Sequence, residues 1–175
     1  MREGKAMIRE LKFHLYEPLI STILAEVEVE AGHLEEGLAT LDAQLAENAD
    51  TGQRWFDAEV QRVRGELLLR REPADVGMAE AALTRAVKIA QLQQTRTFEL
   101  RAVLALARLY QATDRSEAGR MLLRPVAARF KGEPELPEVA AAYRLLASLS
   151  ERPHGDLLPV PGGINCCLNQ SRSGR

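Results

Sequence analysis

The chain has few of the residues that small proteins use as reactive or cross-linking groups. Its 175 residues include two cysteines, three histidines and one tryptophan, and aromatic residues make up 5%. Cys166 and Cys167 are adjacent, so they cannot close a long loop by a disulfide. The histidines are far apart in sequence and none has a second ligand at helical spacing, so we expect neither a metal nor a cofactor.

Long apolar runs and catalytic motifs are also missing. No stretch approaches the roughly 18 apolar residues of a membrane span, and the first residues lack the apolar core of a signal peptide. We therefore expect a cytoplasmic protein that does not bind membranes. A phosphate-binding GxxxxGK loop is absent, and Ser21, Ser116 and Ser148 lie in no nucleophile motif. The sequence predicts that the protein is not an enzyme.

The charge balance is mild overall but uneven along the chain. The net charge is −2, which does not indicate direct binding of nucleic acid. Residues 1–50 carry 4 Lys and Arg against 11 Asp and Glu, whereas residues 51–131 carry 15 against 9. This asymmetry is consistent with solvated helix faces, with an acidic partner for the basic segment, or with self-association of unlike ends.

The sequence is rich in alanine, leucine, glutamate and arginine, which favour helices. Amphipathic helix pairs are predicted over residues 24–45, 60–90 and 104–126. Small residues recur at Gly37, Ala79 and Ala118, at steps of 42 and 39 residues, near the period of two-helix repeats. We expect an all-α fold of about three helix pairs, with a last helix over 137–149 that caps the array.

Two local features of these helices make specific predictions. The first helix is expected from Pro18 to Gly32, with an inward stripe formed by Leu19, Ile20, Ile23, Leu24, Val27 and Ala31. At the start of the second helix of the third pair, Asp114 and Glu117 have the spacing of an acidic capping box.

The two ends of the chain differ from the repeats. Residues 1–16 are expected to form the second helix of an incomplete repeat, with an exposed packing face of Met7, Ile8 and Leu11. We interpret the chain as a piece of a longer array, or as one that packs this face on another subunit. Residues 17–150 form the predicted repeat domain. Residues 151–175 are rich in proline and glycine without periodicity, which predicts a disordered tail.

The residue pattern resembles tetratricopeptide (TPR) repeats, with Gly65, Ala79 and Ala86 at the small positions. The more specific segments are TGQRWFDAEVQRVRGELLL (51–69) and MAEAALTRAVKIAQLQQTRTFELRAVLALARLY (78–110). They resemble the C-terminal repeat region of bacterial class III adenylate and guanylate cyclases, and of STAND-type predicted ATPases and LuxR-like transcriptional regulators. The likeness covers about residues 6–150. It implies a right-handed α-α superhelix that serves a signalling or transcriptional regulator.

The resemblance does not carry over the activity of those regulators. The 175 residues contain no phosphate loop, no acid pair of a cyclase metal site and no recognition helix. A sensory or scaffolding role is what the resemblance implies for this chain.

A recognition surface is the remaining functional candidate. First helices line the concave side of stacked pairs, and here they carry Arg62, Arg64, Arg101 and Arg108. Guanidinium groups on such a stripe could bind carboxylates of a protein or an acidic peptide, or they could be solvated. We expect a protein-binding module. The alternative is a transmission segment that packs on its own upstream ATPase, cyclase or DNA-binding domain, or on another subunit, without a separate ligand.

Overall fold

The fold is built from helices alone in the residues that the computed structural model describes, which are 14–71, 75–132 and 136–150. These residues form seven α-helices, one short 3-10 helix (η1) and no strand, which confirms the predicted all-α class. The bounds are η1 His14–Tyr16, α2 Glu17–Glu30, α3 Leu34–Thr51, α4 Asp57–Leu68, α5 Val76–Leu92, α6 Arg96–Ala112, α7 Ser116–Ala128 and α8 Pro137–Ser150.

Several predictions lie outside the described residues. They are the helix expected before residue 14, its packing face of Met7, Ile8 and Leu11, and the tail from residue 151 with its two cysteines.

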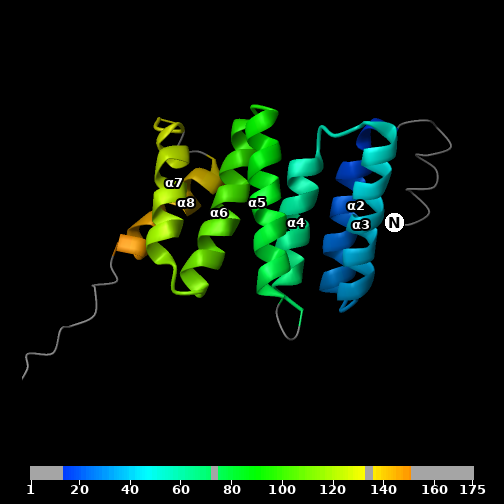
Figure 1. Ribbon diagram of the computed structural model, residues 1–175, viewed down its shortest axis with the longest axis horizontal. Helices are drawn as coiled ribbons and strands as arrows, with labels where there is room; N and C mark the ends of the chain where they lie inside the picture. Colours follow the sequence, from blue (N-terminus) through cyan, green and yellow to red (C-terminus); the bar gives the residue numbers. More distant parts are fainter. Residues whose placement is uncertain (1–13, 72–74, 133–135, 151–175) are drawn as a thin grey trace, which may run out of the picture.

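The helices stand side by side in a row from α2 and α3 at one end to α7 and α8 at the other (Figure 1). Each of α2, α4 and α6 packs against the helix that follows it in the chain, giving three antiparallel pairs. In addition, α2 contacts α4, α4 contacts α6, and α6 contacts α8. We call α2, α4, α6 and α8 the first-helix layer, because the second helices α3, α5 and α7 pack on it.

The second helices share one close-packed position. Gly37, Ala79 and Gly119 are each the fourth residue of their helix, and the amide of each donates to the carbonyl of the N-cap residue. All three are buried, whereas Ala118 is exposed. The predicted repeat position Ala118 is therefore wrong by one residue, and the steps between equivalent positions are 42 and 40 residues.

A small residue on each first helix faces this position. A Cβ on Gly37 would lie 2.8 Å from the carbonyl oxygen of Ala25, and one on Gly119 would lie 3.1 Å from that of Ala107. In the second pair the glycine is on the first helix, where a Cβ on Gly65 would lie 3.2 Å from a carbonyl oxygen of α5. Ala25, Gly65 and Ala107 are thus equivalent. This repeat register relates α2 to α4 by 40 residues, and both α3 to α5 and α4 to α6 by 42.

The expected inward stripe of the first helix is largely wrong. Of its six members only Leu24 is buried, and Ile23, Val27 and Ala31 are exposed. Small and polar residues face the interior instead, because they let α3 approach closely. The hydroxyl of Thr22 donates to a carbonyl of its own helix one turn earlier at 2.8 Å. The single hydroxyl proton of Ser21 is shared between the carbonyl of Glu17, at 2.8 Å, and Oε1 of Gln44, so both buried hydroxyls are satisfied. The buried residues of α2 are Glu17, Pro18, Ser21, Thr22, Leu24, Ala25 and Glu28.

The start of α7 also differs from the prediction. Arg115 occupies the N-cap position without a side-chain cap hydrogen bond, and Asp114 precedes it with a φ of 57°. Glu117 pairs with Arg120 at 2.6 Å. The helix α7 therefore begins one residue later than the predicted capping box on Asp114 requires.

No described helix has both the length and the apolar run that crossing a membrane requires. The buried side chains of the three pairs and of α8 form one continuous apolar cluster, from Ala25 in α2 to Leu149 in α8. The first-helix layer is consequently held as one surface.

Candidate functional site

Charged residues of α4 form a row on one side of the helix. Glu59, Arg62 and Glu66 are spaced by three and four residues, so they share a face. Arg62 Nη2 lies 2.7 Å from Glu59 Oε1, and Arg62 Nη1 lies 2.6 Å from Glu66 Oε2. The side chains of Arg62 and Glu59 are both buried, so this pair is shielded from solvent.

The row continues across the first-helix layer into α6 and α8. Arg101 of α6 places Nη2 at 2.8 Å from the same Glu59 Oε1, and its Nε at 3.7 Å from Glu138 Oε1 of α8. We call the series Glu66, Arg62, Glu59, Arg101 and Glu138 the ionic row. It joins three helices that are far apart in the sequence.

The electrostatics of the row favour its charged state at Arg62. Burial by itself would lower the pKa of Arg62, but the hydrogen bonds and charges of Glu59 and Glu66 outweigh it and raise the pKa above its ordinary value. Burial raises the pKa of Glu26 on α2, and Arg62 opposes this while Glu59 and Glu66 add to it. The charges of the ionic row thus act on the pKa of Glu26, although Glu26 is on α2.

A hollow of about 390 Å³ lies over the row where α4, α6 and α8 meet. We call it the arginine groove. Four arginines and two glutamates contribute to its lining, so positive charge is in excess. Neither Arg108 nor Arg144 has an ion pair within the described part of the chain, whereas Arg62 and Arg101 are engaged in the ionic row. The lining residues are Arg62, Glu66, Arg101, Leu104, Arg108, Pro137, Glu138, Ala141 and Arg144.

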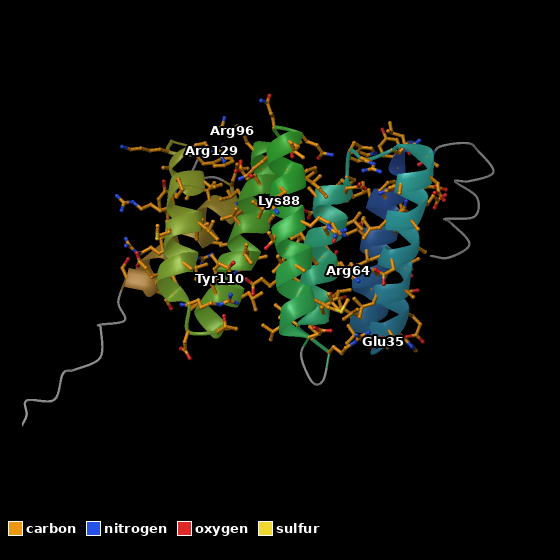
Figure 2. The ribbon with its side chains drawn as sticks, in the orientation of Figure 1. Glu35, Arg64, Lys88, Arg96, Tyr110 and Arg129 are labelled. Atoms are coloured by element: carbon orange, nitrogen blue, oxygen red, sulfur yellow. The ribbon has the colours of Figure 1, made fainter. Side chains whose placement is uncertain are left out.

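Three of the four arginines singled out from the sequence meet in this groove. Arg62, Arg101 and Arg108 line it, whereas Arg64 does not. Arg64 lies between α4 and α3 (Figure 2), and its Nε donates to Asp42 Oδ1 at 2.6 Å. Two residues along a helix correspond to a rotation of about 200°, so Arg62 and Arg64 face different neighbours. Arg64 lines a separate hollow of about 330 Å³ with Arg85.

Sequence reasoning missed Arg144, Glu59 and Glu138. The repeat step was a signal for Arg144. Charged residues recur at this step, because Arg101 follows Glu59 by 42 residues and Arg144 follows Arg101 by 43. This spacing indicates that α8 occupies the place of another first helix, and its contacts with α6 and α7 agree. The spacing of Glu59 and Arg62 was a signal for their contact, whereas the contact of Glu59 with Arg101 had no sequence signal, since it depends on how α6 packs on α4.

Comparison with known proteins adds no assignment. No protein-family model matches this chain, and no curated protein matches it. Within residues 14–71, 75–132 and 136–150, no group of three or more His, Cys, Asp or Glu side chains is placed to hold a metal ion.

Proposed function

We propose that this chain is a TPR-like protein-interaction module whose arginine groove binds an acidic segment of another polypeptide, without catalysis of its own. One observation carries the proposal: the groove is formed by three first helices, and two of its arginines have no ion pair within the described residues. A guanidinium group binds a carboxylate through two parallel hydrogen bonds, which suits it to acidic side chains and chain ends.

The arginines divide into two roles in this proposal. Arg62 and Arg101 are held by Glu59, so they fix the spacing of α4 and α6 rather than wait for a ligand. Arg108 and Arg144 provide the ligand contacts. A hollow of about 390 Å³ is at the small end of ligand sites, so it accommodates one or two acidic side chains while the rest of the peptide runs along the layer.

The setting that we propose is a bacterial signalling or transcriptional regulator in the cytoplasm. Support comes from the resemblance of segments 51–69 and 78–110, and from the repeat register of 40 and 42 residues between equivalent positions. A right-handed superhelix is part of this proposal, because small residues at the closest approach of each pair are compatible with regular stacking.

The test is a titration of the full chain with a fluorescein-labelled hexaglutamate peptide, followed by fluorescence polarisation. The charge reversals Arg108→Glu and Arg144→Glu are combined in one variant. A charge-assisted hydrogen bond contributes about 1.5–3 kcal/mol, so losing two contacts should weaken binding by roughly a hundredfold or more. Binding should also weaken as salt rises, because both arginines are exposed.

The matched control is one variant that combines Arg85→Glu and Arg124→Glu, since it changes the net charge by the same amount and both are exposed arginines, on α5 and α7, outside the groove. It should change the dissociation constant by less than threefold. Equal losses in the control and the groove variant would show that the peptide responds only to net charge. Binding that ignores both salt and the groove arginines, or no binding of the peptide at all, would contradict an acidic-peptide site.

A further inference from the structure

The outer side of α2 carries apolar residues that are exposed. Tyr16 is 51% exposed, Ile23 43% and Val27 41%, and Ile20 between them is half-buried. They lie on one side of the helix because their spacing is three and four residues. We call these four residues the α2 open face. An apolar stripe of this kind normally packs against another element.

The repeat register shows that the same stripe is interior in the other pairs. The counterparts of these four residues lie 40 residues later at α4, and a further 42 residues later at α6. All of them are buried apart from Phe98, which is half-buried. The buried counterparts are at most 6% exposed. They are Phe56, Val60, Val63 and Leu67 in α4, and Ala102, Ala105 and Leu109 in α6.

The difference arises from what precedes each helix. Ile23 and Val27 are each two residues from Ala25, so they lie on the opposite side of α2 from its partner α3. Val63 and Leu67 have the same relation to Gly65 in α4. The helix α4 also contacts the preceding pair α2 and α3, and α6 contacts the preceding pair α4 and α5. The α2 open face is therefore the surface on which a preceding helix packs.

We propose that residues 1–13 of this same chain dock on the α2 open face. The helix directly before α4 in the chain is α3, and the helix directly before α6 is α5; both pack on the first helix that follows them. Residues 1–13 hold this place in the sequence before α2. Ten helical residues extend about 15 Å, which matches the stretch from Tyr16 to Val27.

The repeat register also gives this segment a suitable face. Met1, Gly4 and Ile8 correspond to positions that are at most 1% exposed in both α3 and α5. The counterparts are Leu41, Gln44 and Asn48 in α3 and Leu83, Ala86 and Ala90 in α5. The segment thus offers apolar or small residues at all three positions. Of the three residues first singled out as a packing face, only Ile8 falls on this side.

Thiol reactivity in the full chain tests the proposal. Cys166→Ser and Cys167→Ser remove the native thiols, and Ile23→Cys then reports on the α2 open face. Met121→Cys on α7, which replaces a side chain that is 67% exposed, is the reference. At low protein concentration Ile23→Cys should react with a maleimide at least tenfold more slowly than Met121→Cys. Adding Ile8→Asp should bring the two rates within about twofold.

Leu11→Asp is the matched control within the segment, because its counterpart Thr51 is exposed and Gln93 is half-buried. It should leave Ile23→Cys protected, and far-UV circular dichroism should show that the helices remain in every variant. Rapid labelling of Ile23→Cys in the full chain would overturn the proposal. Protection that disappears on dilution would assign the face to a second copy instead, and protection that survives Ile8→Asp would assign it to another part of the chain.

Discussion

The two junctions between successive helix pairs are built from different chemistry. At the first junction a chain of hydrogen bonds links α2, α3 and α4. Ser21 Oγ donates to Gln44 Oε1 at 2.5 Å, Gln44 Nε2 to Asn48 Oδ1 at 2.7 Å, and Asn48 Nδ2 to Asp57 Oδ1 at 2.6 Å. All four residues are buried.

At the second junction two of the four counterparts are apolar, and Ser21 corresponds to the buried Gln61. Gln44 and Asn48 correspond to Ala86 and Ala90, which are fully buried, and only Asp57 keeps an acidic counterpart in Glu99. Glu99 accepts from Gln91 of α5 and pairs with Arg129, the residue that follows α7. One repeat architecture thus accepts either small apolar residues or a satisfied polar chain at the same positions.

The comparison shows that hydrogen bonds fix the relative position of the helices at the first junction, whereas small apolar residues only fill space at the second. Buried alanine gains from close packing but makes no directional contact through its side chain. A buried polar chain gains little net stability, but it penalises any arrangement that breaks it, because an unsatisfied buried group costs about 1–3 kcal/mol. The first junction therefore defines the register of α3 against α4 through hydrogen bonds.

Placing an asparagine at position 90 of the second junction, as at position 48 of the first, should have the largest effect on the free energy of unfolding. Ala90→Asn adds volume at a fully buried position and brings an amide without prepared partners. Overpacking and an unsatisfied amide together should lower the free energy of unfolding by about 3 kcal/mol. Urea denaturation followed by circular dichroism measures it. Ala81→Asn on the exposed side of α5 is the control and should cost under about 1 kcal/mol.

The reverse exchange should have an intermediate effect. Asn48→Ala removes the hydrogen bond donated by Gln44 and the one accepted by Asp57, and we expect a loss of about 2 kcal/mol. The loss should be smaller when Asp57→Asn is already present, because the acceptor is then uncharged. A double-mutant cycle measures this coupling. Simple additivity would show that the residues do not act as a chain.

The smallest effect concerns pH. Burial raises the pKa of Asp57 above its ordinary value of 3.8, and the hydrogen bond from Asn48 and the charge of Arg54 oppose this. The folded protein therefore binds this proton more tightly than the unfolded chain, so the stability from this group is present below pH 3.8 and is lost as pH rises through the folded pKa. Asp57→Asn should consequently be more favourable, relative to the native chain, at pH 7 than at pH 3.5.

Thermal midpoints of both proteins across pH 3.5–7 check this sign. Glu26 has a raised pKa too, but it is present in both proteins and cancels in the difference. A midpoint difference that stays constant with pH would mean that Asp57 titrates alike in the folded and unfolded states.

Local patterns in the sequence predicted much of this structure. The helices and their pairing follow from apolar spacing and turn residues, and the seven-residue spacing of Arg101 and Arg108 placed both on the groove. The prediction of which side of α2 is buried was wrong, because an apolar stripe in a sequence does not reveal whether another helix packs on it. Glu59 was missed because its two arginine partners come from different helices, and Gly119 because the turn before α7 sets its register.

Glu59 has a consequence for the whole molecule. One carboxylate oxygen holds guanidinium groups from two successive repeats, so a single atom couples the distance between α4 and α6 to the charge in the groove. Mutation at this residue would alter the scaffold and its recognition surface together. The two properties cannot vary independently at this point, and a substitution there would need compensation on both helices.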